Sequence, residues 1–439
     1  MTLSSHRRSA YPRLAAMALV GAVLGVSILT PAAGAGAPSG GAGGAPVAAA
    51  VPATVPVAAP DTVRKDQWQL AALHAKTAWQ YATGQGVIVG VLDSGVDGKH
   101  PDLAGQVLPG LDLVTTSRDG RFDPVGHGTT VAGLIAGSAA DDRGALGLAP
   151  QAKILPVRVL NADNRYDDAT VVARGVRWAV DNGARVLNLS LGGIGNSEPL
   201  AEALDYAFAK DVVVIACTGN VTASTPTEVW YPAREPGVVA VSGLDRAHGG
   251  VLWPNSITGP ATVISAPAAA LVGARPGGTH WRVQGTSFAA PLVTATAALI
   301  RSRWPAMSAG NVVNRLITTA RDMGPVGRDE SYGFGALDPV AALTRVIPPV
   351  DGNPLDTKPS PGRVGFGPAD AGADGAKAAE VGTRQLAADG TRNHAGGGQE
   401  PAASTPSKGS NGGLLGGVAL FAVLVTGGVL VARRRLLGR

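Results

Sequence analysis

The sequence has almost no cysteine. It also has no regular apolar patterning near its two ends. Cys217 is the single cysteine among 439 residues, so no disulfide can form within the chain. This excludes the disulfide framework of small secreted domains, and it is compatible with a bacterial exported enzyme stabilised by its hydrophobic core. The 61 glycines and 32 prolines are more frequent per residue in the two ends than in the middle of the chain. The middle is therefore the part expected to fold.

Acidic residues are absent from residues 1–37 and 414–439, whereas seven of the 37 lysines and arginines lie there. The formal net charge of +5 therefore originates at the ends, and the remaining chain has a small excess of acids. A basic face for nucleic acid is not indicated, and we expect no nucleic-acid partner. Basic ends instead indicate an orientation relative to a membrane.

Residues 1–37 have the three parts of an export signal. The basic start consists of Arg7, Arg8 and Arg13. An apolar run, Leu14–Leu29, is followed by small residues around Ala35 that suit cleavage. We predict a signal peptide over 1–37. The paired arginines leave a twin-arginine export route open, and an uncleaved anchor is the other alternative.

The remaining boundaries follow from composition. Residues 38–65 form an Ala/Pro-rich N-terminal extension that is too short for a self-stable prodomain, and whether it lies across a cleft stays open. Residues 346–413 are rich in Pro, Gly, Ala, Ser and Asp, which predicts a disordered tether.

Residues 414–432 form a run of 19 residues without charge, followed at once by three arginines. A helix of this length spans about 28 Å, close to the thickness of a bilayer core. We therefore predict a transmembrane helix at 414–432 and a basic cytoplasmic tail at 433–439. A buried core helix is the alternative. The expected localisation is the cell membrane, with one span and the folded domain outside the cytoplasm.

Residues 66–345 alternate between buried strands and helices. Continuous apolar runs predict strands at 87–92, 154–160, 186–189, 212–216 and 238–241. Amphipathic stretches predict helices at 68–79, 129–137, 168–183, 199–210 and 308–320. This alternation favours a single α/β domain with a central, mostly parallel sheet and helices on both faces. A turn and short strand at 332–338 are expected to close it.

A serine lies at the expected start of an apolar helix in the stretch 285–291, Gly-Thr-Ser-Phe-Ala-Ala-Pro. A hydroxyl placed there can attack a carbonyl group, because the free N–H groups of a helix N-terminus can bind the oxyanion that develops. The alternative is that Ser287 is only an N-cap. The polar residues upstream decide between the two interpretations.

Asp93 directly follows the buried strand at 87–92, and His127 begins an apolar helix between Gly126 and Gly128. A carboxylate at the end of a strand can orient an imidazole and stabilise its cation. Asp97 is the competing carboxylate, but it lies in the following loop and is expected to be structural. Among the other histidines, His74, His100, His248 and His280 are expected to lie at the surface or to form local hydrogen bonds.

Two further segments follow buried strands. Asn220 ends the segment 216–220, where its amide can donate to an oxyanion, although a simple turn is the alternative. Ser190, Leu191, Gly192 and Gly193 follow the strand at 186–189, where an exposed edge could pair with an extended peptide. Ser190 lacks a helix start behind it, so we place it in the substrate cleft.

The chain order Asp93, His127, Ser287 is the subtilisin order of the catalytic triad. With the surrounding motifs, residues 68–345 resemble the subtilisin-like serine proteases. The resemblance implies that Ser287 is the nucleophile, His127 the base and Asp93 its partner. It places Asn220 at the oxyanion, and Ser190 to Gly193 with Gly219 in the cleft. A polypeptide is the implied substrate.

Within that family the chain is most similar to the mycosins, the membrane-anchored proteases of type VII secretion. The entry helix with Trp68 and Trp79, the signal, the tether and the anchor carry this resemblance. The single cysteine and the long tether depart from the mycosin pattern. The resemblance implies the type VII machinery as a partner. A housekeeping exported protease and a scaffold with dispensable proteolysis stay open as alternatives.

Two other possibilities carry less weight. An α/β-hydrolase esterase is not favoured, because the Gly-x-Ser-x-Gly elbow is absent around Ser287 and the chain order differs. The acids Asp141 and Asp142 resemble a calcium loop of some relatives. Two adjacent acids are more often a solvated turn, and calcium requires six or more oxygen ligands. We therefore expect no metal site and no cofactor.

Overall fold

The computed structural model describes residues 55–56, 60–116, 119–139, 143–222, 227–246 and 250–356. All of them belong to one compact unit, Met1–Ala371. The predicted signal peptide 1–37, the transmembrane helix 414–432, the tail 433–439, most of the tether 346–413 and the acids Asp141 and Asp142 lie outside the described residues. A membrane-spanning helix is not found among the residues that are described.

A seven-stranded sheet forms the centre of this unit, in the order β3-β4-β2-β5-β6-β7-β8, and all neighbouring strands are parallel. The strands are β2 (Ile88–Asp93), β3 (Leu111–Asp112), β4 (Lys153–Arg158), β5 (Val186–Leu189), β6 (Val213–Cys217), β7 (Val239–Leu244) and β8 (Ile264–Pro267). The inner strands β5, β6 and β7 are buried throughout, which is why they appear in the sequence as continuous apolar runs.

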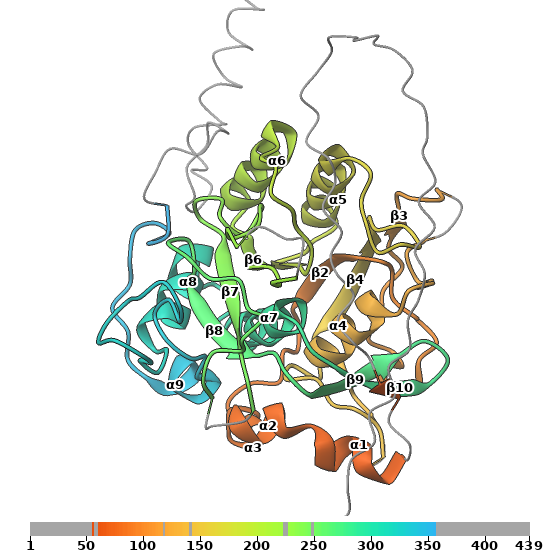
Figure 1. Ribbon diagram of the computed structural model, residues 1–439, viewed down its shortest axis with the longest axis horizontal. Helices are drawn as coiled ribbons and strands as arrows, with labels where there is room; N and C mark the ends of the chain where they lie inside the picture. The colour runs from red at the N-terminus through yellow and green to blue at the C-terminus, as the bar shows by residue number, and fades with distance from the viewer. Residues whose placement is uncertain are drawn as a thin grey trace, which may run out of the picture. The chain divides into compact units, whose positions relative to one another are not determined.

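Helices cover both faces of the sheet (Figure 1). On one face α5 (Ala169–Asp181) packs beside α6 (Glu198–Ala209), and on the other α4 (His127–Ala136) packs against α7 (Thr286–Arg303). α8 (Ala309–Thr318) and α9 (Pro339–Thr344) pack against α7. The predicted α/β fold class is confirmed. The predicted helices at 129–137, 168–183, 199–210 and 308–320 match α4, α5, α6 and α8 within two residues at each end.

Three features differ from the sequence prediction. The expected helix at 68–79 is divided into α2 (Trp68–Ala72) and α3 (Ala75–Ala78), because His74 adopts a left-handed conformation with φ of 48°. The expected strand within 332–338 forms only isolated bridges, through Gly333 and Ala336. A second, antiparallel sheet was not expected: β1 (Val55–Pro56) pairs with β10 (Thr279–Val283), which pairs with β9 (Leu271–Arg275).

Packing also extends past both predicted limits of the folded region. β1 and α1 (Pro60–Asp66) lie before the predicted start of the domain at residue 66, except for Asp66 itself. Val63 in α1 is buried with Ala145 and Val272. At the other end, Asn353 donates to the carbonyl oxygen of Gly237 at 2.8 Å. The folded unit thus includes part of the predicted extension and the first residues of the predicted tether.

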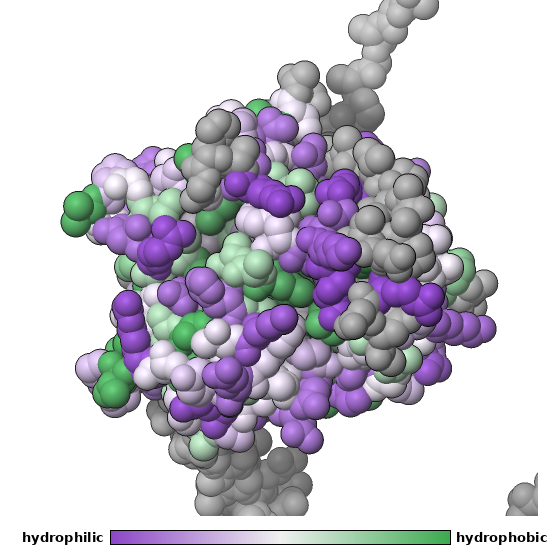
Figure 2. All heavy atoms as spheres, turned by 90° about the horizontal axis from the view of Figure 1, so that it is seen from below, coloured by the Kyte–Doolittle hydropathy of each residue, from purple (hydrophilic) through white to green (hydrophobic). Residues whose placement is uncertain are grey.

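Figure 2 views the molecule from the side on which α1, α2 and α3 lie in Figure 1. Hydrophilic side chains cover most of the visible described surface, and apolar side chains form small groups among them. Large exposed apolar residues of the described chain are few; they are Tyr81, Phe122, Ile194, Val251, Val326 and Val346. Scattered residues of this kind are normal for a folded domain.

Candidate active site

The polar residues predicted from the sequence lie where strands of the large sheet end and helices begin. Asp93 is the last residue of β2, and Asn220 follows β6. His127 is the first residue of α4, and Ser287 is the second residue of α7. In a parallel sheet the carboxyl ends of the strands share one edge, which is where ligands bind in folds of this type.

Asp93 and His127 form a direct hydrogen bond. The distance from His127 Nδ1 to Asp93 Oδ1 is 2.7 Å, and both side chains are buried. A carboxylate only accepts hydrogen bonds, so Nδ1 carries the proton and Nε2 of the neutral ring carries the lone pair. Gly128 permits this approach, because a Cβ atom there would lie 2.1 Å from the carbonyl oxygen of Gly95. The histidine therefore has the tautomer that a base acting through Nε2 requires.

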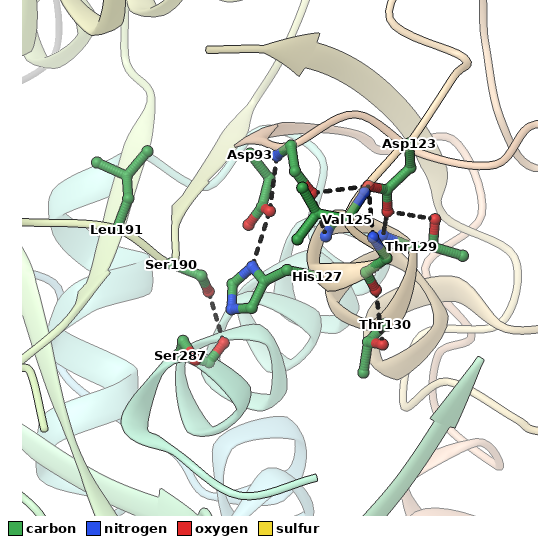
Figure 3. A network of polar contacts seen from close by, with 12 residues as sticks. Asp93, Asp123, Val125, His127, Thr129, Thr130, Ser190, Leu191 and Ser287 are labelled. Carbon is green, nitrogen blue, oxygen red and sulfur yellow. Dashed lines mark hydrogen bonds and ion pairs between the residues drawn. The ribbon is translucent and has the colours of Figure 1, made fainter. Parts of the chain in front are cut away.

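The imidazole of His127 lies between Asp93 and Ser287 (Figure 3). Its ring packs against Phe288, the residue after Ser287, with ring centroids 5.1 Å apart. Ser287 is 5% exposed, and no described residue forms a hydrogen bond with its hydroxyl group. Its main-chain N–H lies in the first turn of α7, where such groups have no partner within the helix. The serine therefore retains a free hydroxyl beside a helix N-terminus.

Ser190 faces α7. Its hydroxyl donates to the main-chain oxygen of Ser287 at 2.6 Å and accepts from Asn188 Nδ2 at 2.9 Å. Thr294 in α7 donates to the amide oxygen of the same asparagine at 2.9 Å. The Ser190 side chain is therefore buried under the cleft and anchors the start of α7. This contact differs from the substrate contact that its position in the sequence suggested.

Asn220 is oriented by the residue that precedes Ser287. Its Oδ1 atom accepts from the main-chain N–H of Thr286 at 2.9 Å and from the Thr286 hydroxyl at 3.0 Å. Because a main-chain N–H can only donate, the atom facing Thr286 must be the amide oxygen, and the NH₂ group therefore occupies the other end of the amide. Beside it, Gly219 has φ of 107°, and a Cβ atom there would lie 2.5 Å from the indole ring of Trp230.

The predicted cleft edge is only partly available for a peptide. Gly193 exchanges both of its main-chain hydrogen bonds with Tyr231, at 2.9 and 2.7 Å. Within the described part of the chain, neither the N–H nor the C=O of Gly192 has a partner. The side chain of Leu191 is buried. The main chain of Gly192 could thus pair with an extended polypeptide.

Asp123 was not identified from the sequence, although it is the most connected carboxylate near the histidine. Its two oxygens accept hydrogen bonds from the side chains of Ser94 and Thr129 and from the main chain of the loop that carries His127. The main-chain donors are Val125, Gly126 and Thr129, at 3.0, 2.7 and 2.9 Å (Figure 3). Its position four residues before His127 was the only signal in the sequence, and this spacing alone does not show that the loop folds back around it.

Asp97, the competing carboxylate, does not bind the histidine. Its oxygens accept from the main-chain N–H groups of Lys99 and Gly277, at 3.0 and 2.9 Å. It therefore connects the loop after β2 to the β9–β10 turn.

Cys217 at the end of β6 is fully buried, and burial raises the pKa of its thiol to about 12. At neutral pH this thiol is uncharged and a poor nucleophile.

The fold and this arrangement of Asp, His and Ser define an α/β hydrolytic enzyme of the subtilisin type. A family model described as "Subtilase family" matches residues 84–335, more than half of the chain. The chain therefore belongs to the subtilase family of serine endopeptidases, and the predicted resemblance is confirmed.

Among similar proteins, fervidolysin from Fervidobacterium pennivorans is 34% identical over 319 residues, covering 66% of this chain and 45% of its own length. This chain thus spans less than half of that relative. The solved structure of MycP1 from Mycobacterium smegmatis has a TM-score of 0.59 and 29% identity, over 69% of this chain and 91% of MycP1. MycP3, a protease from the type VII (ESX-3) secretion system, has a TM-score of 0.59 and 31% identity, over 68% and 94%.

Proposed function

We propose that the protein is an exported, membrane-anchored serine endopeptidase that acts with a type VII secretion system. The observation that carries the catalytic part is the 2.7 Å bond between Asp93 and His127, with Ser287 at the adjoining start of α7. The bond fixes the tautomer of the histidine, and the helix start supplies main-chain donors.

In the proposed reaction, Ser287 Oγ attacks the scissile carbonyl carbon while His127 Nε2 removes its proton. The tetrahedral oxyanion binds the N–H of Ser287 and the NH₂ group of Asn220. His127 then returns the proton to the leaving amine, and Asp93 stabilises the imidazolium that forms between these two steps. Water hydrolyses the acyl-enzyme by the same sequence of proton transfers.

The proposed substrate is an extended polypeptide. The unpaired main chain of Gly192 supports this, because an extended segment can pair with it by strand addition. The structural similarity to MycP1 and MycP3 supports a role beside a type VII system, since MycP3 is a protease from such a system. The uncharged run at 414–432, followed by three arginines, supports the membrane anchor and a catalytic domain on the outer side.

The catalytic proposal is tested by Ser287→Ala in the full chain purified in detergent. Peptide hydrolysis is expected to fall by about 10⁶-fold, and labelling by a fluorophosphonate probe is expected to disappear. Ser302→Ala is the matched control in the same helix, because that serine donates only to the carbonyl oxygen of Gln85. Unchanged hydrolysis in Ser287→Ala would show that another residue is the nucleophile.

The cellular proposal is tested in the native host with a deletion strain complemented by either chain. Loss of substrate processing with Ser287→Ala, together with its recovery by the unchanged chain, is the expected result. Full restoration of secretion by Ser287→Ala would assign the protein a scaffolding role instead. Normal secretion in the deletion strain itself would separate the protease from the secretion system.

A further inference from the structure

A groove lined by apolar side chains and two arginines lies at the end of α7 that is farthest from Ser287. It has a volume of about 670 Å³ and is formed by the end of α7, the start of α8 and the segment that follows α9. Its apolar wall includes Trp304, Pro305, Met307, Ile347, Pro348 and Pro349. Arg303 and Arg315 also line it, and no acidic residue among those described does. We propose that this groove is a second binding site, which holds an acidic, extended peptide segment of a partner protein.

Arg315 is a buried cation without an acidic partner. It is 6% exposed, and burial together with the nearby charge of Arg303 lowers its pKa. Its Nε atom donates to the carbonyl oxygen of Ala342 at 2.8 Å, and Nη2 donates to the carbonyl oxygen of Arg345. Carbonyl groups carry no full charge, and no carboxylate in the described part of the chain contributes to the pKa of this guanidinium group. Charged side chains are seldom buried unless they are paired, so the groove lacks a negative charge.

Arg303 adds a second positive charge to the same groove. Its Nε atom is buried and has no hydrogen-bond partner among the described residues. Its guanidinium carbon lies 4.9 Å from the centroid of the Trp304 ring, and that of Arg315 lies 4.3 Å from the same ring. Such contacts hold a guanidinium group in place but do not neutralise it. Two positive charges therefore lie against one indole ring, where a bound carboxylate would relieve their mutual repulsion.

Hydrogen bonds hold the wall that follows α9 in place. Asn314 Nδ2 donates to the carbonyl oxygen of Pro348 at 3.1 Å. Asn311 exchanges two hydrogen bonds with the main chain of Val350, at 3.0 and 2.9 Å. The segment after α9 is thereby fixed across α8. A peptide therefore meets a groove that is already formed, which reduces the entropy lost on binding.

The chemistry of the groove favours a peptide as its ligand. A guanidinium group can bind a carboxylate through two parallel hydrogen bonds, so aspartate and glutamate side chains suit both arginines. The half-buried Trp304, Met307 and Ile347 offer apolar surface to the side chains between the acids. An anionic membrane fits less well, because Arg315 is buried and anionic lipids attract basic residues at the protein surface.

The groove lies apart from the active site. Ser287 is the second residue of α7, and Arg303 is the last. At 1.5 Å per residue these two positions are about 24 Å apart along the helix. A peptide in the groove therefore leaves the catalytic residues free, so the site can hold a partner while a substrate is cleaved.

The experiment measures fluorescence anisotropy of two labelled synthetic peptides on the full Ser287→Ala chain in detergent, so that neither peptide is cleaved. One peptide consists of repeated Glu-Pro-Leu units, and the other has Gln in place of each Glu. We expect the acidic peptide to bind more tightly by about tenfold or more, and its affinity to fall as the salt concentration rises. Equal affinities of the two peptides at every salt concentration would overturn the proposal.

Variants in the same chain locate the site. Arg303→Gln is expected to weaken binding of the acidic peptide by about tenfold or more, whereas Arg174→Gln, at an exposed arginine of α5, is expected to leave it unchanged. Thermal unfolding reports whether each variant is folded. If Arg303→Gln does not fold, Arg303→Lys decides, because it keeps the charge and loses the two parallel hydrogen bonds. Unchanged affinity in the folded variant would place the peptide elsewhere and overturn the proposal.

Other occupants of the groove give different results. Binding to phosphatidylglycerol vesicles that Arg303→Gln abolishes, without binding of the acidic peptide, would assign the groove to a membrane surface. Self-association of the chain that Arg303→Gln abolishes, again without peptide binding, would assign it to a second copy of the chain. Either result would overturn the proposal.

Discussion

The hydroxyl group of Ser190 donates a hydrogen bond of 2.6 Å to the main-chain oxygen of Ser287. The bond joins the end of β5 to the first turn of α7, and Asn188 donates to the same hydroxyl from inside the strand. The nucleophile is therefore held through its main chain, and its own hydroxyl stays free. Substitutions at such buried polar contacts can show whether a contact contributes to the proposed reaction or only to the stability of the fold.

Ser190→Ala is expected to lower kcat by about twofold to tenfold with little change in KM. The reason is that one hydrogen bond, typically worth about 0.5–1.5 kcal/mol, no longer holds the main chain of Ser287. Steady-state kinetics on a peptide substrate measures this. Ser265→Ala is the control, because that buried serine donates to the carbonyl oxygen of Gly335, away from the triad. An equal loss in both variants would indicate a general effect on stability.

Asp123→Asn is expected to lower kcat by tenfold or more and the free energy of unfolding by about 2 kcal/mol. An amide presents an NH₂ group where a carboxylate oxygen now accepts, and leaving a buried donor unsatisfied costs about 1–3 kcal/mol. We expect the pH profile of kcat to shift as well, because the loop that Asp123 holds carries His127.

The matched control for this prediction is Asp119→Asn in the same loop. Asp119 forms an exposed ion pair with Arg121, which contributes little in water. Its kinetics and its unfolding are expected to stay close to those of the unchanged chain. A loss of stability in Asp123→Asn with unchanged kcat and pH profile would restrict Asp123 to a structural role.

The buried ion pair between Asp112 and Arg158, at 3.0 Å, is expected to make stability depend on pH. Burial alone would raise the pKa of Asp112, but hydrogen bonds from Thr115 and Val114 and the charge of Arg158 outweigh it and lower the pKa. The stabilisation is therefore present above the unfolded pKa of about 3.9 and is lost as the pH falls through the lower folded value.

Asp112→Asn should therefore lower the free energy of unfolding by about 3 kcal/mol at pH 7, since it leaves a buried guanidinium group unpaired. Urea unfolding at pH 7 and at progressively lower pH measures the difference between the two chains. The difference is expected to shrink below pH 4. A constant difference over this range would show that the charge of Asp112 does not contribute.

The sequence predicts much of this fold because its signals are local. Buried parallel strands appear as apolar runs, and α5, α6 and α8 begin at Asp168, Ser197 and Ser308, whose side chains cap them. Asp93 and His127 could be predicted to meet, since strands end and helices begin at the same edge of a parallel α/β sheet. These features can be recognised from short, local segments of the sequence.

Other features depend on contacts between distant segments. The main chain of Gly193 is paired with Tyr231, and β1 pairs with a strand more than 220 residues away. Neither pairing has a periodic pattern, because β1 has only two residues and Gly193 forms an isolated bridge. The role of Asp123 likewise depends on a loop that folds back on itself, which residue spacing does not reveal.

Burial of Cys217 makes the chain a convenient subject for spectroscopy. A thiol that is fully enclosed and uncharged at neutral pH reacts poorly with maleimides, and the sequence has no second one. A cysteine introduced on an exposed loop could therefore be labelled with a fluorophore or a spin probe without first removing the native residue. Distances within the working enzyme could be followed in this way while its own chemistry remains intact.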